Sequence, residues 1–202
     1  MADSEESRRA PENLLPVQSF QIQMDLRHHG ALWLGTLPYA LIAAGALLRL
    51  APHPPNFAPI GALALFGGGV LPRPWGVVVP LAAMALSDIR LGFGPGTAWV
   101  YASFVLIALL GSTALRRRNV LRIVGTSVGA SLLFYAVTNF GEWLGPLYPH
   151  TPTGLAASYI AAIPFFRNTA LSDLGYTLAL FGIHESVLRL VRRPARVSTT
   201  AV

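Results

Sequence analysis

Residues 97–118 read TAWVYASFVLIALLGSTALRRR, an apolar run that ends at three consecutive arginines. From Thr97 to Leu115 the run contains no charged residue, and it is close to the ~20 residues that a helix needs to cross the hydrocarbon core of a bilayer. Another apolar run begins at Val120, directly after the arginines. Apolar runs of this length that end in cations predict membrane-spanning helices whose charged ends lie at the membrane surface.

The same pattern recurs along the chain. Turns rich in proline, glycine or arginine separate the further apolar runs, at about residues 31–50, 58–71, 75–91, 120–140 and 168–190. The runs 58–71 and 75–91 are short for full spans. Residues 155–166 are apolar but interrupted by Pro164, and we expect them to form an interfacial or re-entrant piece.

These runs predict an all-α fold, a polytopic transmembrane bundle of six helices. We expect the membrane domain to cover residues 29–192, with a polar N-terminal tail at 1–28 and a polar C-terminal tail at 193–202. Composition supports this class, because 53% of the residues are hydrophobic, only 12% are charged, and the mean hydropathy is +0.52. Soluble domains carry about 25% charged residues, so this chain has too few to cover a water-soluble surface.

Composition also excludes several functions. The chain has no cysteine, which rules out disulfides, thiolate metal ligands and thiol nucleophiles. Its formal charge of +6 comes from arginine alone, since there is no lysine. These arginines lie at the ends of apolar runs and form no basic face interleaved with aromatic residues, so we expect no binding to nucleic acid. We also expect no metal and no cofactor.

The arginines predict the orientation. If the first helix starts inside, twelve of the fifteen arginines fall on the cytoplasmic side, and the outer side holds only Arg49, Arg90 and Arg167. Cytoplasmic loops of membrane proteins carry the excess of basic residues. The sequence therefore predicts a multi-pass membrane protein with both termini in the cytoplasm.

Polar side chains gather toward the predicted outer ends of the helices. Asp88 and Asp173 lie near span ends, and a charge at a helix centre costs about 2.5–3.5 kcal/mol to insert. Such residues face a wet pocket or pair with one another, and the sequence leaves open whether they capture a small solute or pair with Arg90, Arg49 or Arg167 to fix the bundle. The predicted substrate-binding residues are His53, Asn56, Phe57, Asp88, Arg90, Asn139, Glu142, Trp143, Arg167, Asn168 and Asp173.

Two alternatives come from other classes. Residues 125–129 fit the G-x-S-x-G pattern of serine hydrolases, and Ser127 with His184 would form an intramembrane nucleophile and base. The pattern lies inside a helical run, so we favour a protein that is not an enzyme. The other alternative is a structural or assembly subunit without substrate. Ala40 and Ala44 form a small-residue face on the first helix, where an energising membrane subunit would dock.

The sequence also resembles a known family. The string RLAPHPPNFAPI at residues 49–60 resembles the signature of a family of uncharacterised bacterial membrane proteins, and the resemblance continues through residues 61–68, 87–88, 138–141, 163–168 and 173. That family is similar to the substrate-binding S-components of energy-coupling-factor vitamin transporters, six-helix proteins that capture a vitamin from the outer side. The resemblance implies a location in the bacterial inner membrane and uptake of a vitamin or its precursor. The related solitary cobalamin transporter ligates cobalt through a cysteine, which this chain lacks.

The predicted topology can be tested with single cysteines, because the native chain has none. Cysteines placed at Gly94 and His150 should react with a membrane-impermeant thiol reagent in intact spheroplasts, since both positions lie in predicted outer turns. A cysteine at Arg117 should not react until the membrane is opened. Labelling at Arg117 in sealed spheroplasts would reject the six-span topology.

Overall fold

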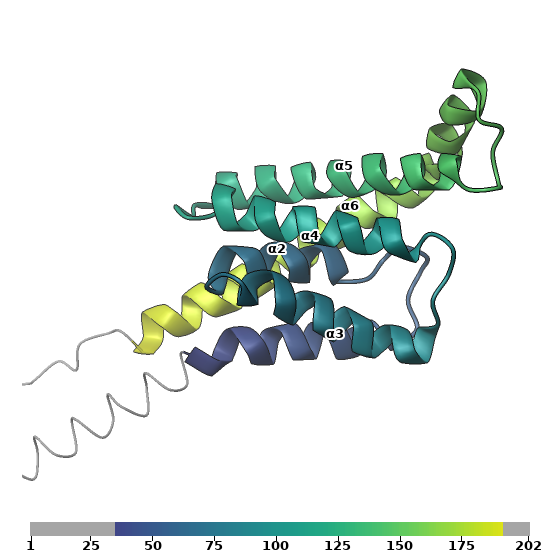
Figure 1. Cartoon of the computed structure of the whole chain (residues 1–202). Helices are drawn as coiled ribbons and strands as arrows, with labels where there is room; N and C mark the ends of the chain where they lie inside the picture. The colour runs from purple at the N-terminus through teal and green to yellow at the C-terminus, as the bar shows by residue number, and fades with distance from the viewer. Residues whose placement is uncertain (1–34, 192–202) are drawn as a thin grey trace, which may run out of the picture. The chain divides into compact units, whose positions relative to one another are not determined.

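The computed structural model describes residues 35–191, which form six helices and contain no strand (Figure 1). The predicted all-α class is confirmed for this part of the chain. The predicted tails at 1–28 and 193–202 lie outside the described residues. From Leu37 onward the described chain belongs to one compact unit, and every contact below lies within it. The helices are Gly35–Leu48, α2 (Ile60–Val70), α3 (Trp75–Leu91), α4 (Thr97–Ala114), α5 (Val120–Leu144) and α6 (Pro152–Val191).

Three of these helices, α4, α5 and α6, are long and apolar enough to cross a membrane. The other three are shorter. At 1.5 Å per residue, the 11 residues of α2 cover about 16 Å, roughly half of a ~30 Å hydrocarbon core. The bundle of six helices therefore agrees with the sequence prediction, while six complete spans stay a prediction.

The sequence prediction for residues 155–190 is wrong in one respect. Instead of an interfacial piece followed by a span from about residue 168, the structure has a single helix of 40 residues, with Pro164 inside it. A proline inside a helix removes one hydrogen bond and bends the helix without necessarily ending it. Figure 1 shows the first part of α6 running at an angle to the rest.

Two tyrosines hold the first part of α6 against α5. The Tyr135 hydroxyl on α5 donates to the carbonyl oxygen of Tyr159 on α6 at 2.5 Å. The Tyr159 hydroxyl donates in the other direction, to the carbonyl oxygen of Ala136 at 2.7 Å. These reciprocal bonds fix the segment before Pro164 on a neighbouring helix, which explains why the helix continues there.

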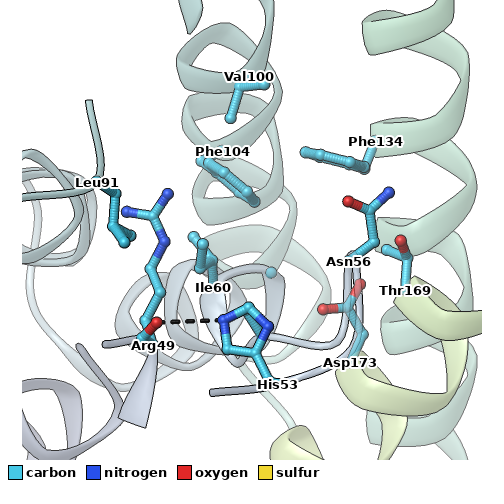
Figure 2. Close-up of a pocket in the computed structure, with 12 residues that line it drawn as sticks. Arg49, His53, Asn56, Ile60, Leu91, Val100, Phe104, Phe134, Thr169 and Asp173 are labelled. Atoms are coloured by element: carbon cyan, nitrogen blue, oxygen red, sulfur yellow. Dashed lines mark hydrogen bonds between the residues drawn. The ribbon is translucent and has the colours of Figure 1, made fainter. Parts of the chain in front are cut away.

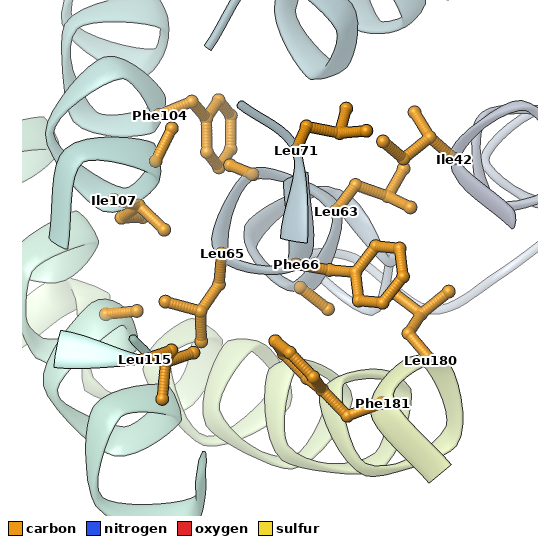
Figure 3. Packing of buried hydrophobic residues seen from close by; sticks show 14 of the residues in the cluster. Ile42, Leu63, Leu65, Phe66, Leu71, Phe104, Ile107, Leu115, Leu180 and Phe181 are labelled. Atoms are coloured by element: carbon orange, nitrogen blue, oxygen red, sulfur yellow. The ribbon is translucent and has the colours of Figure 1, made fainter. Parts of the chain in front are cut away.

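The short helix α2 lies at the centre of the bundle. All its residues from Gly61 to Gly68 are buried, and it packs against α3, α4, α5 and α6. Figure 3 shows Leu65 and Phe66 of α2 directed into the hydrophobic core. The Phe66 ring meets the Phe181 ring of α6 edge to face, with centroids 5.1 Å apart. A helix that is apolar on all sides must be surrounded, and α2 is surrounded by the longer helices.

Glycines let α2 and α4 approach each other closely. A Cβ atom added to Gly68 would collide with the backbone oxygen of Ala108 on α4, and one added to Gly111 on α4 would collide with the backbone oxygen of Leu65 on α2. The backbones are therefore in direct contact from both sides. Small residues allow this packing in membrane bundles, where dispersion contacts between helices replace the hydrophobic effect.

We expect Gly68→Ala to destabilise the protein by about 1–3 kcal/mol, because the new methyl group forces two backbones apart. Gly125→Ala on α5 is the matched control, since a Cβ atom at Gly125 meets no heavy atom within 4 Å. That change should be neutral or stabilise by up to about 1 kcal/mol, because alanine is the better helix former. Thermal unfolding in mild detergent measures both, and equal melting temperatures would contradict the close contact.

Candidate functional site

The proline-rich turn at residues 51–59 is fixed to α6 by side chains from one face of that helix. The Asn168 amide donates to the carbonyl oxygen of Pro55 at 3.0 Å. One helical turn later, the Ser172 hydroxyl donates to the carbonyl oxygen of Ala58 at 3.0 Å. Prolines remove four backbone donors from this turn, so its carbonyl groups need partners from elsewhere, and α6 supplies them.

The carboxylate of Asp173 lies at the N-terminus of α2. It accepts a hydrogen bond from the backbone N–H of Ala62 and another from the Ser131 hydroxyl at 2.8 Å. The residue that precedes α2 is Pro59, which makes no side-chain cap, so Asp173 caps α2 from another helix. A Cβ atom at Gly61 would collide with this carboxylate, so only glycine allows the approach.

Asp173 is 2% exposed, and among residues 35–191 no cation forms an ion pair with it. The pairing of Asp173 with an arginine, one of the two alternatives that the sequence left open, is not found in this part of the chain. A buried carboxylate of this kind is stabilised by hydrogen bonds and by the helix N-terminus instead.

Asp88 does pair with an arginine. Its carboxylate forms an ion pair with Arg49, which comes directly after the first helix, and accepts a hydrogen bond from the Tyr101 hydroxyl at 2.8 Å. The Arg49 guanidinium also donates to Ser87 Oγ at 2.5 Å. The Arg49 and Asp88 side chains are 15% and 7% exposed. The pair is thus largely removed from solvent and joins the first helix to α3.

A cavity of about 310 Å³ lies between Arg49 and Asp173 (Figure 2). Phe104 of α4 and Phe134 of α5 form part of its wall, and their rings are stacked with centroids 5.2 Å apart. In Figure 2, Arg49 and Asp173 lie on opposite sides of the cavity, with His53 between them. The lining residues are Arg49, His53, Asn56, Ala58, Ile60, Gly61, Leu91, Val100, Phe104, Phe134, Thr169 and Asp173.

Of the residues predicted to bind substrate, the structure brings three together around this cavity: His53, Asn56 and Asp173. Asp88 adjoins it through its ion pair with Arg49. Phe57 and Asn168 do not line the cavity, but they hold the turn that does. The Phe57 ring meets the Tyr176 ring of α6 edge to face, with centroids 6.2 Å apart.

The other predicted residues lie away from this cavity. The Asn139 amide donates to the Tyr135 carbonyl oxygen within its own helix, at 2.8 Å. Trp143 Nε1 donates to the Pro149 carbonyl oxygen in the turn between α5 and α6, at 3.0 Å. The remaining residues in this group, all solvent-exposed and none of them lining the cavity, are Arg90, Glu142 and Arg167.

Sequence reasoning missed most of the cavity wall. The polar lining residue Thr169 adjoins the predicted Asn168, and Arg49 is not among the residues predicted to bind substrate. The apolar lining residues Ile60, Leu91, Val100, Phe104 and Phe134 carry no signal of their own. In a membrane helix, lipid-facing and cavity-facing positions are both apolar, so composition does not separate them.

The hydrolase alternative lacks the required local structure. Residues 125–129 lie inside the continuous helix α5, whereas the serine motif needs a sharp turn between a strand and a helix. The Ser127 hydroxyl donates to Thr177 Oγ1 at 3.4 Å, and both residues are buried. His184 packs against the Phe66 ring, with centroids 5.6 Å apart. The geometry favours helix packing for both residues.

A protein-family model matches residues 34–196 of the chain. The chain belongs to this family, a family of unknown function (DUF6580). The match includes every helix that the structure describes and every residue that lines the cavity. No curated protein and no solved structure matches the chain. The function of this DUF6580 member therefore has to be argued from the cavity itself.

For this DUF6580 protein we expect Asp88→Asn and Arg49→Gln each to lower the free energy of unfolding by about 3–5 kcal/mol, because each strands a largely buried partner charge. The double variant Arg49→Gln/Asp88→Asn should recover part of the loss. Arg90→Gln on the same helix is the control and should stay within about 0.5 kcal/mol, since Arg90 is exposed. Chemical unfolding in detergent measures these differences. A fully stable Asp88→Asn protein would show that the ion pair does not fix the bundle.

Proposed function

We propose that this protein is a multi-pass inner-membrane protein that binds a small solute in the cavity next to Arg49 and Asp173 and takes part in its uptake. The observation that carries the proposal is the cavity. Its volume of about 310 Å³ falls within the 300–1,000 Å³ of small-molecule sites. It also has the composition of such sites, with apolar and aromatic walls and a small number of polar groups that converge on one space.

The distribution of arginines supports an outward-facing cavity. Arg73, before α3, donates to Ser112 Oγ near the end of α4 at 2.7 Å, and Arg118 donates to the carbonyl oxygen of Gly69 near the end of α2 at 3.4 Å. The arginine-rich turns thus lie together at the end of α2 opposite to Asp173. If basic turns face the cytoplasm, the cavity faces outward and both termini are cytoplasmic.

The lining favours a flat solute with several hydrogen-bonding groups. Phe104 and Phe134 offer apolar ring surfaces, the Asn56 amide offers donors and an acceptor, and the Thr169 hydroxyl, which donates to the Phe165 carbonyl oxygen, offers an acceptor. The charge of Arg49 is already matched by Asp88, so the cavity does not require an anionic ligand. A vitamin or vitamin precursor has this chemistry, in line with the resemblance to S-components.

Uptake against a gradient needs an energy source, and the chain contains no phosphate-binding glycine loop with a lysine. We propose that an energising membrane subunit docks on the first helix at Ala40 and Ala44. Both alanines are exposed in the described chain. A small-residue face of this kind allows close helix–helix contact. The competing proposal, a structural subunit without substrate, does not explain the cavity.

The proposal is tested first by mass spectrometry of small molecules that co-purify with the protein in mild detergent. Wild-type protein should retain a specific solute, and Val100→Trp should lose it, because the larger side chain fills the cavity from its wall. Leu106→Trp, on an exposed position of the same helix, is the control and should retain the solute. If all three proteins retain the same molecules, the cavity is not the binding site.

The polar lining can then be tested with the identified solute. Asn56→Gly should weaken its binding by about 5- to 100-fold, the loss expected when one hydrogen-bonding group is removed from a site. Glycine is the suitable replacement because Asn56 has a φ of 57°, a left-handed conformation that glycine adopts without strain. Asn139→Ala, which removes an amide outside the cavity, should leave the affinity unchanged. Isothermal titration of the purified proteins measures both.

A further inference from the structure

A second cavity, of about 490 Å³, lies where α4 ends, α5 begins and α6 reaches its last turns. Three arginines line it, Arg116, Arg118 and Arg189, together with the single carboxylate of Glu185. Its charged lining therefore carries a net charge of about +2 at neutral pH. The remaining lining residues are Asn119, Val120, Ile123, Leu178, Phe181, Gly182 and Ser186.

The three arginines differ in whether they form an ion pair. Arg118 Nε lies 3.5 Å from Glu185 Oε1, so this arginine accounts for the one carboxylate in the lining. Arg116 Nε donates to the carbonyl oxygen of Ser112 at 3.3 Å, which positions the side chain without neutralising it. Neither Arg116 nor Arg189 forms an ion pair with any carboxylate among residues 35–191. Two guanidinium groups thus face one cavity with their charge uncompensated by the described chain.

The other part of the lining is apolar and opens to the outside of the bundle. Val120 is 71% exposed and Leu178 is 41% exposed. On α6, Gly182 lies between Leu178 and Arg189, and an added Cβ atom there would meet no heavy atom within 4 Å. The cavity is therefore amphipathic, with cations at one side and an open apolar surface at the other.

We propose that this cavity binds an anionic phospholipid, with the phosphodiester group held by Arg116 and Arg189 and an acyl chain lying against Leu178 and Gly182. Guanidinium groups donate paired hydrogen bonds that match phosphate oxygens. Basic pockets between membrane helices at the cytoplasmic side are suited to phospholipid headgroups. A soluble anion would explain the arginines but not the exposed apolar surface that continues from them. The site lies at the opposite end of α2 from the solute cavity and depends on membrane embedding, not on solute binding.

The test is native mass spectrometry of the whole protein in mild detergent, titrated with phosphatidylglycerol or with phosphatidylcholine. Wild type should bind phosphatidylglycerol more tightly. The double variant Arg116→Gln/Arg189→Gln should lose about 30-fold in affinity for phosphatidylglycerol, which is about 2 kcal/mol at 1.4 kcal/mol per tenfold, the contribution expected from two arginines. Arg117→Gln/Arg122→Gln removes the same charge from exposed residues that do not line the cavity, and it should change the affinity less than 3-fold.

Two further arms distinguish a lipid from a small anion. Gly182→Leu keeps every charge and occupies the apolar side of the cavity, so it should also weaken phosphatidylglycerol binding. Inorganic phosphate at millimolar concentration should not displace the lipid. The proposal is overturned if the two lipids bind wild type equally, if both double variants lose the same affinity, or if inorganic phosphate displaces the lipid and Gly182→Leu has no effect.

Discussion

The carboxylate of Asp173 at the N-terminus of α2 determines the rest of the arrangement. The central helix begins directly after a proline, and the N–H groups of its buried first turn need acceptors, because an unsatisfied buried group costs several kcal/mol. Asp173 satisfies one of these groups from α6, because its side chain accepts a hydrogen bond from the backbone N–H of Ala62 in the first turn of α2. Because the start of α2 is fixed in this way, the turn at residues 51–59 is fixed as well, and with it His53 and Asn56 in the cavity wall.

The charged side chains around the two ends of α2 differ in how they are paired. At the N-terminal end, the arginine that lines the cavity, Arg49, is paired with Asp88, and the side chain of Asp173 caps α2. At the C-terminal end, arginines outnumber carboxylates around the second cavity. Matched charges suit a site within the bundle, where isolated ions are costly, and unmatched arginines suit a membrane surface that supplies anions. The same asymmetry gives the molecule its predicted orientation.

Much of the fold could be predicted because strong local signals end the helices. The prediction for α3 agrees with the structure at both ends, and that for α4 differs by one residue, since proline, glycine and consecutive arginines mark their limits. The prediction failed at Pro164, because the segment before it depends on hydrogen bonds between α5 and α6 that sequence does not reveal.

The site could be predicted only in part. Polar residues in an apolar chain indicated the end of the bundle where the cavity lies, and Asp173, which lines that cavity, is one of the predicted residues. The position of each residue along the bundle axis was not predictable, because it depends on where each helix begins. Phe134 lines the cavity, and Trp143, nine residues later on α5, lies about 13 Å further along the helix, beyond the cavity. The sequence indicated which residues are unusual, and only helix packing shows which of them meet.

A structural role for Asp173 does not exclude a role in binding. An ionised carboxylate has about four acceptor sites. The N–H of Ala62 and the hydroxyl of Ser131 account for two of them, and the residue also borders the cavity. In the proposed function, a donor on the solute bonds to the remaining acceptor sites while the cap on α2 stays intact. The solute then contacts the group that positions the central helix, so occupancy of the cavity bears directly on how firmly α2 is held. In the proposed function, the carboxylate that holds α2 in the empty protein is thus also the group through which a bound solute would act on the bundle.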